Sequence, residues 1–363
     1  METLIPADAV GAARPERCGP AAPGHARCNV RLAPSFGTQQ VGADSLPAGF
    51  SPKQLKQVYG FPTGNRVGEG ETVALVTAYD APNLEADLKV FTKKFDLPSC
   101  TTGNGCFTKV DYDGGTNIPP ASSAIWALEA TLDVQWAHAI APGAKILLVE
   151  APSDNFVELF RAMRTAGARA DYVSLSWGGP ENPDLAIFEQ LFTEFPNVSY
   201  FAAAGDSGLM PAYPAGSPNV VAVGGTRLKV VDGEFKKETG WSSGGGGCSA
   251  VFNATASQLN HPTYPQVGCA GRRAFPDVSS LGDPDTPAAI YISSAPFSGW
   301  EVIAGTSLSS PIIAARAAGT RQLVRQPYIY GDQIAFRDIR DGNNGAPCLR
   351  GFDLVTGRGS WTG

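Results

Sequence analysis

A pair of acidic residues four positions apart is the first feature of this sequence that could do chemistry. Glu129 and Asp133 lie in the run 126–136, which is rich in Ala, Leu and Trp and has helical spacing. Four residues advance an α-helix by about 400°, so both carboxyl groups lie on one face, roughly 6 Å apart along the axis. Burial and mutual repulsion would raise the pKa of at least one of them, which suits acid–base work. The alternative is a solvated acidic pair on an amphipathic helix.

A serine in a turn that begins with glycine could supply a nucleophile. Ser307 follows Gly305 and Thr306 and precedes an apolar, Ala-rich run at 312–318 that predicts a helix. Glycine permits close backbone approach, and the free N–H groups of a helix's first turn point where an oxyanion could form. The alternative is an ordinary Ser or Thr N-cap before a buried helix.

A third polar residue stands at the end of a predicted strand. Asp206 follows the apolar run 198–203 in a Gly-rich turn. In a parallel sheet, functional sites gather at the carboxyl ends of the strands, where a protonated Asp206 could donate a hydrogen bond to a developing oxyanion. The alternative is a plain Asp-Ser-Gly turn.

The three histidines disfavour a conventional Ser-His-Asp triad. A serine hydroxyl needs a base, usually a histidine that an aspartate orients. His25 lies in the N-terminal stretch, His261 in a Pro-flanked loop, and His138 near the end of the helix that carries the acidic pair. A carboxylate base is therefore favoured, and a subtilisin-type enzyme with His138 as the base is the alternative.

The elements that must position these residues alternate between strands and helices. Apolar, β-branched runs predict buried strands at 72–77, 145–150, 172–176, 198–203 and 220–223, and helical spacing appears at 84–95, 121–139, 156–166 and 185–195. This alternation predicts an α/β fold with a mostly parallel central sheet and helices on both faces.

Composition and the N-terminal stretch narrow the class of protein further. With 42 Gly and 29 Pro in 363 residues the chain is no helical bundle, and its net charge of −6 disfavours nucleic-acid binding. It lacks an apolar run of about 18 residues, so we expect no membrane span, and its start does not resemble a signal peptide. Residues 1–46 lack hydrophobic periodicity, so we expect a leader, propeptide remnant or linker that adds nothing to the core, followed by one domain over 47–363.

The cysteines indicate loops closed by disulfides. Six of the seven fall into short-range neighbours, at positions 18/28, 100/106 and 248/269. Such spacing is typical of proteins from an oxidising compartment, whereas free buried thiols are the alternative. Cys348 has no near neighbour.

In their order along the chain, these features resemble the sedolisins, serine-carboxyl peptidases with a subtilisin-like fold. The resemblance implies that Ser307 is the nucleophile and Glu129 the general base and then acid. It also implies that Asp133 orients Glu129, and that Asp206 joins the Ser307 amide in the oxyanion hole. The short-spaced cysteines look like those of the disulfide-bearing bacterial secreted branch. The matching pieces are Glu129-x-x-x-Asp133, 174–181, 205–208, 275–279 and 305–307.

The resemblance further implies a secreted, monomeric endopeptidase that cleaves protein or peptide substrates through an acyl-enzyme. A Glu, with a reference pKa near 4.3, can accept a proton at an acidity where a His, near 6.5, is already protonated. Asp206 must stay protonated to donate, so we expect an acidic optimum. We expect an extended substrate to bind along the backbone near 174–178 and the loop at 241–248 by strand pairing. A tripeptidyl exopeptidase of the same family and an inactive, calcium-stabilised scaffold are the alternatives.

One structural Ca²⁺ is also implied, near the C-terminal end of the chain. Its ligands would be the carboxylates of Asp338 and Asp353 and the backbone carbonyls of Ile339, Leu349 and Gly351. Calcium prefers several hard oxygen ligands, and carbonyl ligation tolerates Leu349 where the family usually has Gly. The alternative is a plain pair of Asx-rich turns.

Overall fold

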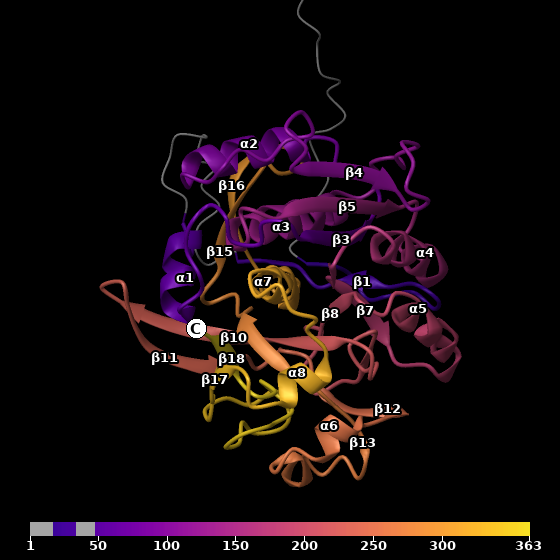
Figure 1. The fold of residues 1–363 in the computed structure, drawn as a ribbon, viewed down its shortest axis with the longest axis vertical. Helices are drawn as coiled ribbons and strands as arrows, with labels where there is room; N and C mark the ends of the chain where they lie inside the picture. The colour runs from indigo at the N-terminus through magenta and orange to yellow at the C-terminus, as the bar shows by residue number, and fades with distance from the viewer. Residues whose placement is uncertain (1–16, 34–47) are drawn as a thin grey trace, which may run out of the picture.

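The computed structural model describes residues 17–33 and 48–363, which fold around one large sheet (Figure 1). From β18 to β4 all neighbouring strands are parallel, in the order β18-β14-β10-β8-β6-β3-β5-β4, while β17 and β11 pair antiparallel at β18 and β10. This arrangement confirms the predicted α/β class and its mostly parallel sheet. The strands are β3 (Thr72–Ala78), β4 (Phe107–Asp111), β5 (Lys145–Ala151), β6 (Tyr172–Leu175), β8 (Ser199–Ala203), β10 (Val221–Val231), β11 (Glu234–Gly240), β14 (Val278–Leu281), β17 (Ala335–Arg337) and β18 (Ser360–Thr362).

Short strands form smaller sheets around this one, and helices cover it. One small sheet joins β1 (Arg27–Cys28), β7 (Trp177–Pro180) and β9 (Ala212–Tyr213), and another joins β15 (Ala288–Ile292), β16 (Gly299–Ala304) and β2 (Arg31–Leu32). Strands β12 (Gly247–Asn253) and β13 (Arg272–Phe275) pair with each other. The helices are α1 (Pro52–Tyr59), α2 (Leu84–Lys94), α3 (Ala124–Ile140), α4 (Phe156–Gly167), α5 (Glu189–Glu194), α6 (Ala256–Leu259), α7 (Thr306–Ala318) and α8 (Gln326–Tyr330).

The predicted elements match the observed ones closely, with one exception. The run 185–195 is not one helix but a 3₁₀ helix, Pro183–Phe188, followed by α5. The side chain of Asn182 accepts a hydrogen bond from the Asp184 N–H and so begins a tight turn ahead of the predicted start. The apolar spacing correctly indicated helical structure but did not reveal this division.

Helices α3 and α7 form the buried centre on which the candidate site is built. Every residue from Trp126 to Ile140 is buried, and so is all of α7. The two helices pack against each other, α3 also against β3 and β5, and α7 against β6, β8 and β10. Helices that are buried on all sides belong to the core of the domain. The acidic pair of α3 therefore does not face solvent, which excludes the amphipathic-helix alternative.

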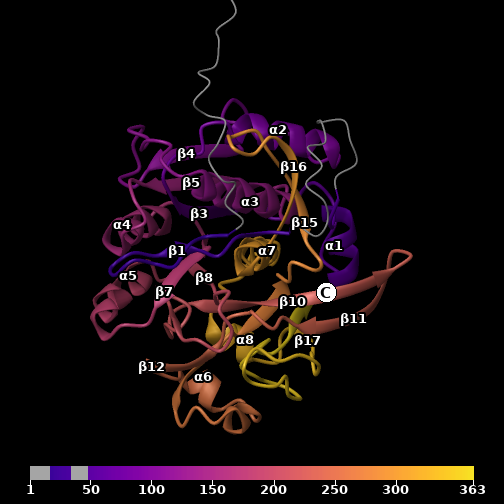
Figure 2. The ribbon, with the colours of Figure 1, turned by 180° about the vertical axis from the view of Figure 1, so that it is seen from behind.

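Residues 17–33 correct one expectation from the sequence. Ala26, Cys28, Val30 and Leu32 are buried within the main hydrophobic core, so this part of the N-terminal stretch does contribute to the core. Its strands β1 and β2 pair with β7 and β16, which lie far along the chain. Local hydrophobic periodicity cannot reveal such long-range pairing. In both ribbon views this indigo segment crosses the molecule beside α7 (Figures 1 and 2). Residues 1–16 and 34–46 lie outside the described residues, and the boundary at 46/47 stays a prediction.

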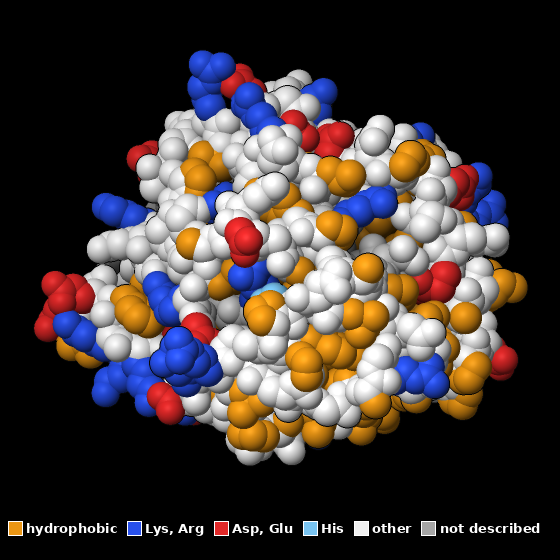
Figure 3. Space-filling model, turned by 60° about the horizontal axis from the view of Figure 1, so that its bottom comes forward, with side chains coloured by type: hydrophobic (Ala, Val, Ile, Leu, Met, Phe, Trp, Pro, Cys, Tyr) orange, Lys and Arg blue, Asp and Glu red, His pale blue; other side chains and the backbone are white. Residues whose placement is uncertain are grey.

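The cysteine pairing expected from spacing is confirmed. Disulfides join Cys18 to Cys28, Cys100 to Cys106 and Cys248 to Cys269, while Cys348 is a buried free thiol. On the face shown in Figure 3, Lys and Arg side chains are mixed with Asp and Glu, so this face presents no continuous basic surface. Among the helices of the described residues, none has the length and apolar character needed to cross a bilayer.

Candidate active site

Glu129 of α3 and Ser307 in the first turn of α7 are in direct contact. Ser307 Oγ lies 2.9 Å from Glu129 Oε2 and 2.9 Å from the backbone oxygen of Ser176, so its single proton can be donated to either. Both side chains are fully buried. Burial raises the pKa of Glu129 well above its usual value, and the nearby Asp133 raises it further. The geometry therefore joins a hydroxyl to a carboxyl group of high proton affinity.

Asp133 lies one helical turn beyond Glu129 and is held by Ser176. Its Oδ1 accepts a hydrogen bond of 2.7 Å from Ser176 Oγ. Burial raises the pKa of Asp133 well above its usual value, and the Ser176 hydroxyl opposes that rise. Among the described residues, Asp133 Oδ2 and Glu129 Oε1 have no hydrogen-bond partner. Each acid of the pair thus keeps one buried oxygen free.

Asp206 follows β8, as predicted, and packs against the start of α7. Its Oδ1 accepts hydrogen bonds from the N–H and the hydroxyl of Thr306, both at 2.9 Å, and its Oδ2 accepts from Arg31 Nε at 3.1 Å. Burial raises the pKa of Asp206, and Arg31 opposes the rise. In this arrangement every named contact of the Asp206 carboxyl group is one in which it accepts.

A peptide group from the N-terminal segment lies against Ser307. The Ser307 N–H donates to the Asn29 carbonyl oxygen at 3.3 Å, and the Asn29 N–H lies 3.0 Å from Ser307 Oγ and 3.2 Å from the Ser176 carbonyl oxygen. Gly305, at φ 102°, lies beneath this carbonyl, because a Cβ there would overlap the Asn29 oxygen. The first turn of α7 therefore binds a peptide carbonyl through a backbone N–H.

The residues on either side of Asn29 extend through a cleft as a strand. We call residues 27–33 the cleft strand. On one side β1 pairs antiparallel with β7, so that Arg27 faces Gly178, and on the other side β2 pairs antiparallel with β16. The predicted substrate-binding edge near 174–178 is thus occupied by the chain itself.

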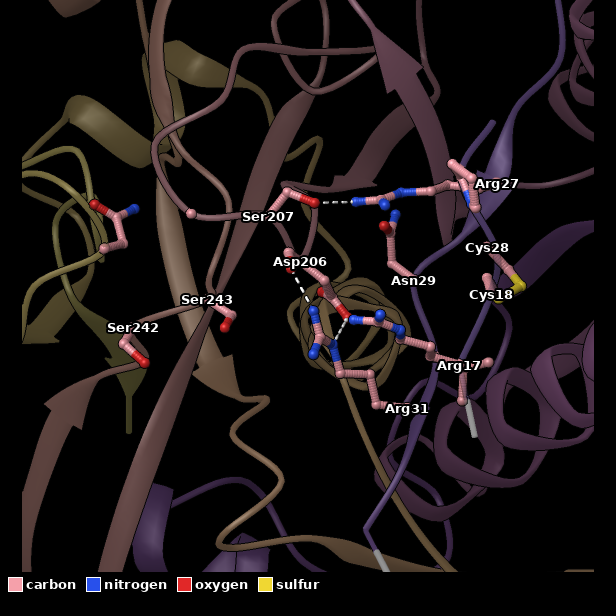
Figure 4. A pocket seen from close by; sticks show the side chains of 15 residues that line it. Arg17, Cys18, Arg27, Cys28, Asn29, Arg31, Asp206, Ser207, Ser242 and Ser243 are labelled. Carbon is pink, nitrogen blue, oxygen red and sulfur yellow. Dashed lines mark hydrogen bonds and ion pairs between the residues drawn. A yellow bond between two sulfur atoms is a disulfide. The ribbon is translucent and has the colours of Figure 1, made fainter. Parts of the chain in front are cut away.

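Of the cavities that adjoin the cleft strand, two are lined by Asn29. The larger, of about 680 Å³, also exposes Arg31, Asp206 and Ser207 (Figure 4). The smaller, of about 260 Å³, is walled largely by backbone and small side chains and includes Gly178, Ala204 and Pro211. The strand therefore leaves open space beside the residue that contacts Ser307.

Comparison with known proteins identifies the family to which this arrangement belongs. A family model described as the subtilase family matches residues 122–335. Kumamolisin of Bacillus sp. (strain MN-32) is 32% identical, over 94% of this chain and 67% of kumamolisin. The chain belongs to the sedolisin family. Sedolisin of Pseudomonas sp. (strain 101) is 29% identical over 55% of this chain and 35% of that protein. Tripeptidyl-peptidase 1 of Mus musculus is 25% identical over 76% and 52% respectively.

A solved sedolisin structure shares the fold. Pseudomonas sedolisin, a serine-carboxyl proteinase complexed with two molecules of pseudo-iodotyrostatin, superposes with a TM-score of 0.72 at 24% identity, covering 87% of this chain and 96% of that one. The chain spans two thirds of kumamolisin and smaller shares of sedolisin and tripeptidyl-peptidase 1. As a sedolisin-family member it is a hydrolase of the serine-type peptidases.

The histidines of this sedolisin-family chain are engaged away from Ser307. His138 Nε2 lies 2.8 Å from the Pro98 carbonyl oxygen, and burial lowers its pKa to about 4. His25 pairs with Asp154 at 2.7 Å, and His261 packs its ring against Tyr330. The subtilisin-type alternative with His138 as the base finds no support in these contacts.

The residues expected to bind calcium lie in one loop region. Asp338 Oδ1 accepts from the Gly351 N–H and Asp353 Oδ2 from the Leu349 N–H, so both carboxylates border the same turn. Asp338 also pairs with Arg340 at 2.6 Å. Among the described residues no hydrogen-bond donor reaches the carbonyls of Ile339, Leu349 and Gly351, whereas those of Arg350 and Phe352 accept from Gln266. Carboxylates and free carbonyls are ligands that Ca²⁺ prefers, but Asp353 Oδ1 also accepts from the N–H groups of Val355 and Thr356, so calcium binding here stays a prediction.

Sequence reasoning found the four polar residues but missed three contacts that complete the site. Ser176 lay within a matched motif, yet no pattern indicated that its hydroxyl would reach Asp133. Asn29 and Arg31 lie in the stretch that was read as a linker, and they meet residues more than 170 positions away. The one signal in the sequence was the neighbouring Cys28, but its partner Cys18 lies in the same stretch and does not point to the rest of the site.

Proposed function

We propose that this chain is an acid-acting serine-carboxyl endopeptidase that cleaves peptide bonds through an acyl-enzyme on Ser307. The observation that carries the proposal is the 2.9 Å contact between Ser307 Oγ and Glu129 Oε2, in a site where the Ser307 amide already binds a peptide carbonyl. A nucleophile, a base and an oxyanion donor within reach of one another meet the geometric requirements of acyl transfer.

In the first step Glu129 takes the proton of Ser307 as Oγ attacks the carbonyl carbon of the substrate. The developing oxyanion is stabilised by the Ser307 N–H and by the carboxylic acid of Asp206. Glu129 then gives its proton to the leaving amine, and the carbon–nitrogen bond breaks. Water, deprotonated by the same Glu129, hydrolyses the ester and restores the hydroxyl of Ser307.

Asp133 is proposed to set the proton affinity of Glu129. Since Glu129 Oε1 and Asp133 Oδ2 are buried without partners among the described residues, a proton shared by the pair would satisfy both oxygens. The Ser176 hydroxyl stabilises the charge on Asp133 from the other side. With one proton bound, the pair carries one negative charge, so Glu129 can accept the proton of Ser307.

The pH dependence follows from the direction of the three pKa shifts. Burial raises the pKa of Glu129, Asp133 and Asp206. As pH rises, Asp206 loses the proton that it must donate, and its negative charge then opposes the oxyanion. As pH falls, the acidic pair becomes doubly protonated and Glu129 can no longer act as a base. Activity is therefore confined to the pH range in which the acidic pair has lost one proton while Asp206 keeps its own.

Endopeptidase rather than tripeptidyl action is favoured by the path of the cleft strand. The Asn29–Val30 bond lies at Ser307, and Arg27 is the third residue on the amino side of that bond. The chain continues beyond it, because the Ala26 N–H donates to the Asp154 carbonyl and His25 pairs with Asn155. A cleft that admits more than three residues on this side suits an endopeptidase.

Calcium and location complete the proposal. Asp338, Asp353 and the carbonyls of Ile339, Leu349 and Gly351 would hold one structural Ca²⁺, which would tie together the loops at 338–341 and 349–353. Three disulfides among the described residues suit an extracellular site of action.

The test is hydrolysis of an internally quenched peptide between about pH 3 and pH 8, compared for the parent, Ser307→Ala and Glu129→Gln. Each is assayed with and without a phosphine reductant, since the cleft strand occupies the site. We expect acid activity in the parent alone, with all three proteins folded by circular dichroism. A folded parent that cleaves nothing under either condition would refute the proposal and favour an inactive scaffold.

A further inference from the structure

Strand β15 lies at the end of the small sheet β15-β16-β2, so one of its edges faces away from β16. Side chains of α3 bind the main chain at this outer edge. Gln135 Nε2 donates to the Tyr291 carbonyl oxygen at 2.7 Å, and Gln135 Oε1 accepts from the Tyr291 N–H at 3.0 Å. Trp136 Nε1 donates to the Ala289 carbonyl oxygen at 3.1 Å. The amide of Gln135 thus pairs with Tyr291 as a neighbouring strand would.

Helix α2 binds the same edge one step further along the chain. The Asp87 carboxyl group accepts from the Ser293 N–H at 3.0 Å and from the Ser293 hydroxyl at 2.7 Å, and Asn83 Nδ2 donates to the Ser293 carbonyl oxygen at 3.3 Å. The bound residues 289, 291 and 293 alternate, as expected for groups that share one edge of a strand. In both ribbon views β15 lies beside α3 (Figures 1 and 2). The two helices therefore fix the outer edge of β15.

The inner edge of β15 transfers this position to β16. Five residue pairs join the two strands over 288–292 and 299–303. The other edge of β16 pairs with β2, on the carboxyl side of the Asn29–Val30 bond. A peptide bound in the place of β2 would therefore have its carboxyl half held by a strand whose place β15 sets.

We propose that Gln135 is a positioning residue for the leaving-group half of the substrate. By binding Tyr291 it sets the place of β15, and through β15 it sets where β16 meets the residues beyond the cleaved bond. The inference rests on the proposed peptidase function and names the half of the substrate that this residue serves. Gln135 acts through the two strands and is not itself a catalytic residue. The site should therefore favour substrates with several residues on the carboxyl side of the cleaved bond over short amides.

The two bonds of Gln135 cannot be replaced by packing alone. Gln135 is fully buried, and an apolar side chain at this position would leave the Tyr291 N–H and carbonyl oxygen without these partners. Main-chain groups inside a protein nearly always have partners, so the strand would move toward other donors, acceptors or water. The ring of Tyr291 packs against Trp300 of β16, with ring centroids 5.4 Å apart, so movement at Tyr291 reaches β16. The expected effect is a displacement of β16, not unfolding.

The same helix carries the catalytic pair and Gln135. Asp133 lies two residues before Gln135 and Glu129 six residues before it, in a helix that is buried along most of its length. In the proposed mechanism Glu129 gives its proton to the leaving amine, which must lie within hydrogen-bond reach. Since α3 bears Glu129 and also fixes β15, one rigid element sets both the proton donor and the strand that holds the chain beyond the leaving nitrogen.

The test compares two substrates that share the same amino half. One is an internally quenched peptide that extends several residues beyond the cleaved bond, and the other is an anilide with no residue there. The readout is the ratio of their kcat/KM values in acid. Both values come from one preparation, so the ratio does not depend on how much of the enzyme is folded or has an accessible cleft.

Gln135→Leu should lower this ratio about tenfold or more, since a misplacement of about 1 Å can cost about a hundredfold in rate. Gln135→Glu should restore it, because the buried new carboxyl group stays protonated in acid and can both donate to and accept from Tyr291. The matched control is Gln258→Leu, which removes the same pair of bonds from a buried glutamine of α6 to Ala274 of β13. Because β13 belongs to a separate two-stranded sheet with β12, the control should keep the parent's ratio. Melting curves verify that all variants fold.

A second measurement does not depend on activity. In a Ser307→Ala background, amide hydrogen exchange over 299–304 should quicken in Gln135→Leu and keep the parent's rate in Gln135→Glu and Gln258→Leu. An unchanged ratio or unchanged exchange in Gln135→Leu would overturn the inference and leave the peptidase in place, as would an equal fall of the ratio in Gln258→Leu. A folded parent that cleaves neither substrate would instead refute the proposed function, and the inference with it, whatever the exchange shows.

Discussion

The hydroxyl of Ser176 offers the most direct test of the carboxylate pair. Ser176→Ala removes the 2.7 Å hydrogen bond to Asp133 Oδ1, and Oδ2 already has no partner among the described residues. A hydrogen bond to a charged group contributes about 1.5–3 kcal/mol. Losing this hydrogen bond destabilises the ionised form of Asp133, so the pKa of Asp133 rises further. The pair then keeps both protons to a higher pH. At 1.36 kcal/mol per unit, the acid limb of kcat/KM should move upward by about one to two pH units.

The matched control for this change lies on the same stretch of chain. Ser174→Ala removes a hydrogen bond of 2.8 Å between two neutral, buried hydroxyls, Ser174 and Ser310. It should lower stability by about 1 kcal/mol and leave the pH profile in place. The assay is kcat/KM for an internally quenched peptide against pH, for the parent and both variants. If both variants leave the acid limb where the parent has it, Asp133 does not govern the base and our reasoning is wrong.

Three further outcomes are expected. Folding raises the pKa of Glu129, so the parent loses stability as pH rises from the ordinary pKa of Glu toward the folded value. In calorimetry, Glu129→Gln should therefore melt at a higher temperature than the parent near neutral pH, and at the same temperature below about pH 4. Equal melting at both pH values would show that Glu129 is not destabilised by burial. Gly305→Ala places a side chain at φ 102° where a peptide carbonyl meets the Ser307 N–H, so kcat/KM for peptide hydrolysis should fall about tenfold or more. Removing calcium with a chelator should lower the melting temperature of the parent. The lost free energy of unfolding is about 2.7 kcal/mol if the calcium concentration had been a hundredfold above its Kd. The melting temperature of Asp338→Asn should not change on chelation.

Part of the candidate site was predictable from sequence, because short spacings and the order of the sheet set part of its geometry. A spacing of four fixes Glu129 and Asp133 on one helix face, and the order of a parallel sheet brings Asp206 to the edge where α7 begins. Spacing could not supply the side of α3 that meets Ser307, 178 residues away. That side is selected by the packing of two helices that are buried on all sides.

The contribution of the N-terminal segment to the core could not be predicted from local sequence, for a physical reason. Two-residue strands carry no measurable periodicity, and β1 and β2 gain their stability from edges of β7 and β16 that lie about 150 or more residues away. The Cys18–Cys28 pairing was predictable because its spacing is short. Its position over Glu129 was not, since nothing in the local sequence specifies which surface a disulfide ring will cover.

Strand β16 lies in the middle of its small sheet and has one more consequence for the site. It ends at Ala304, and only Gly305 and Thr306 separate it from Ser307. A peptide that took the place of β2 would therefore pair with a strand that leads directly into the first turn of α7. In the proposed mechanism, one short stretch of backbone would hold the amine product and carry the ester.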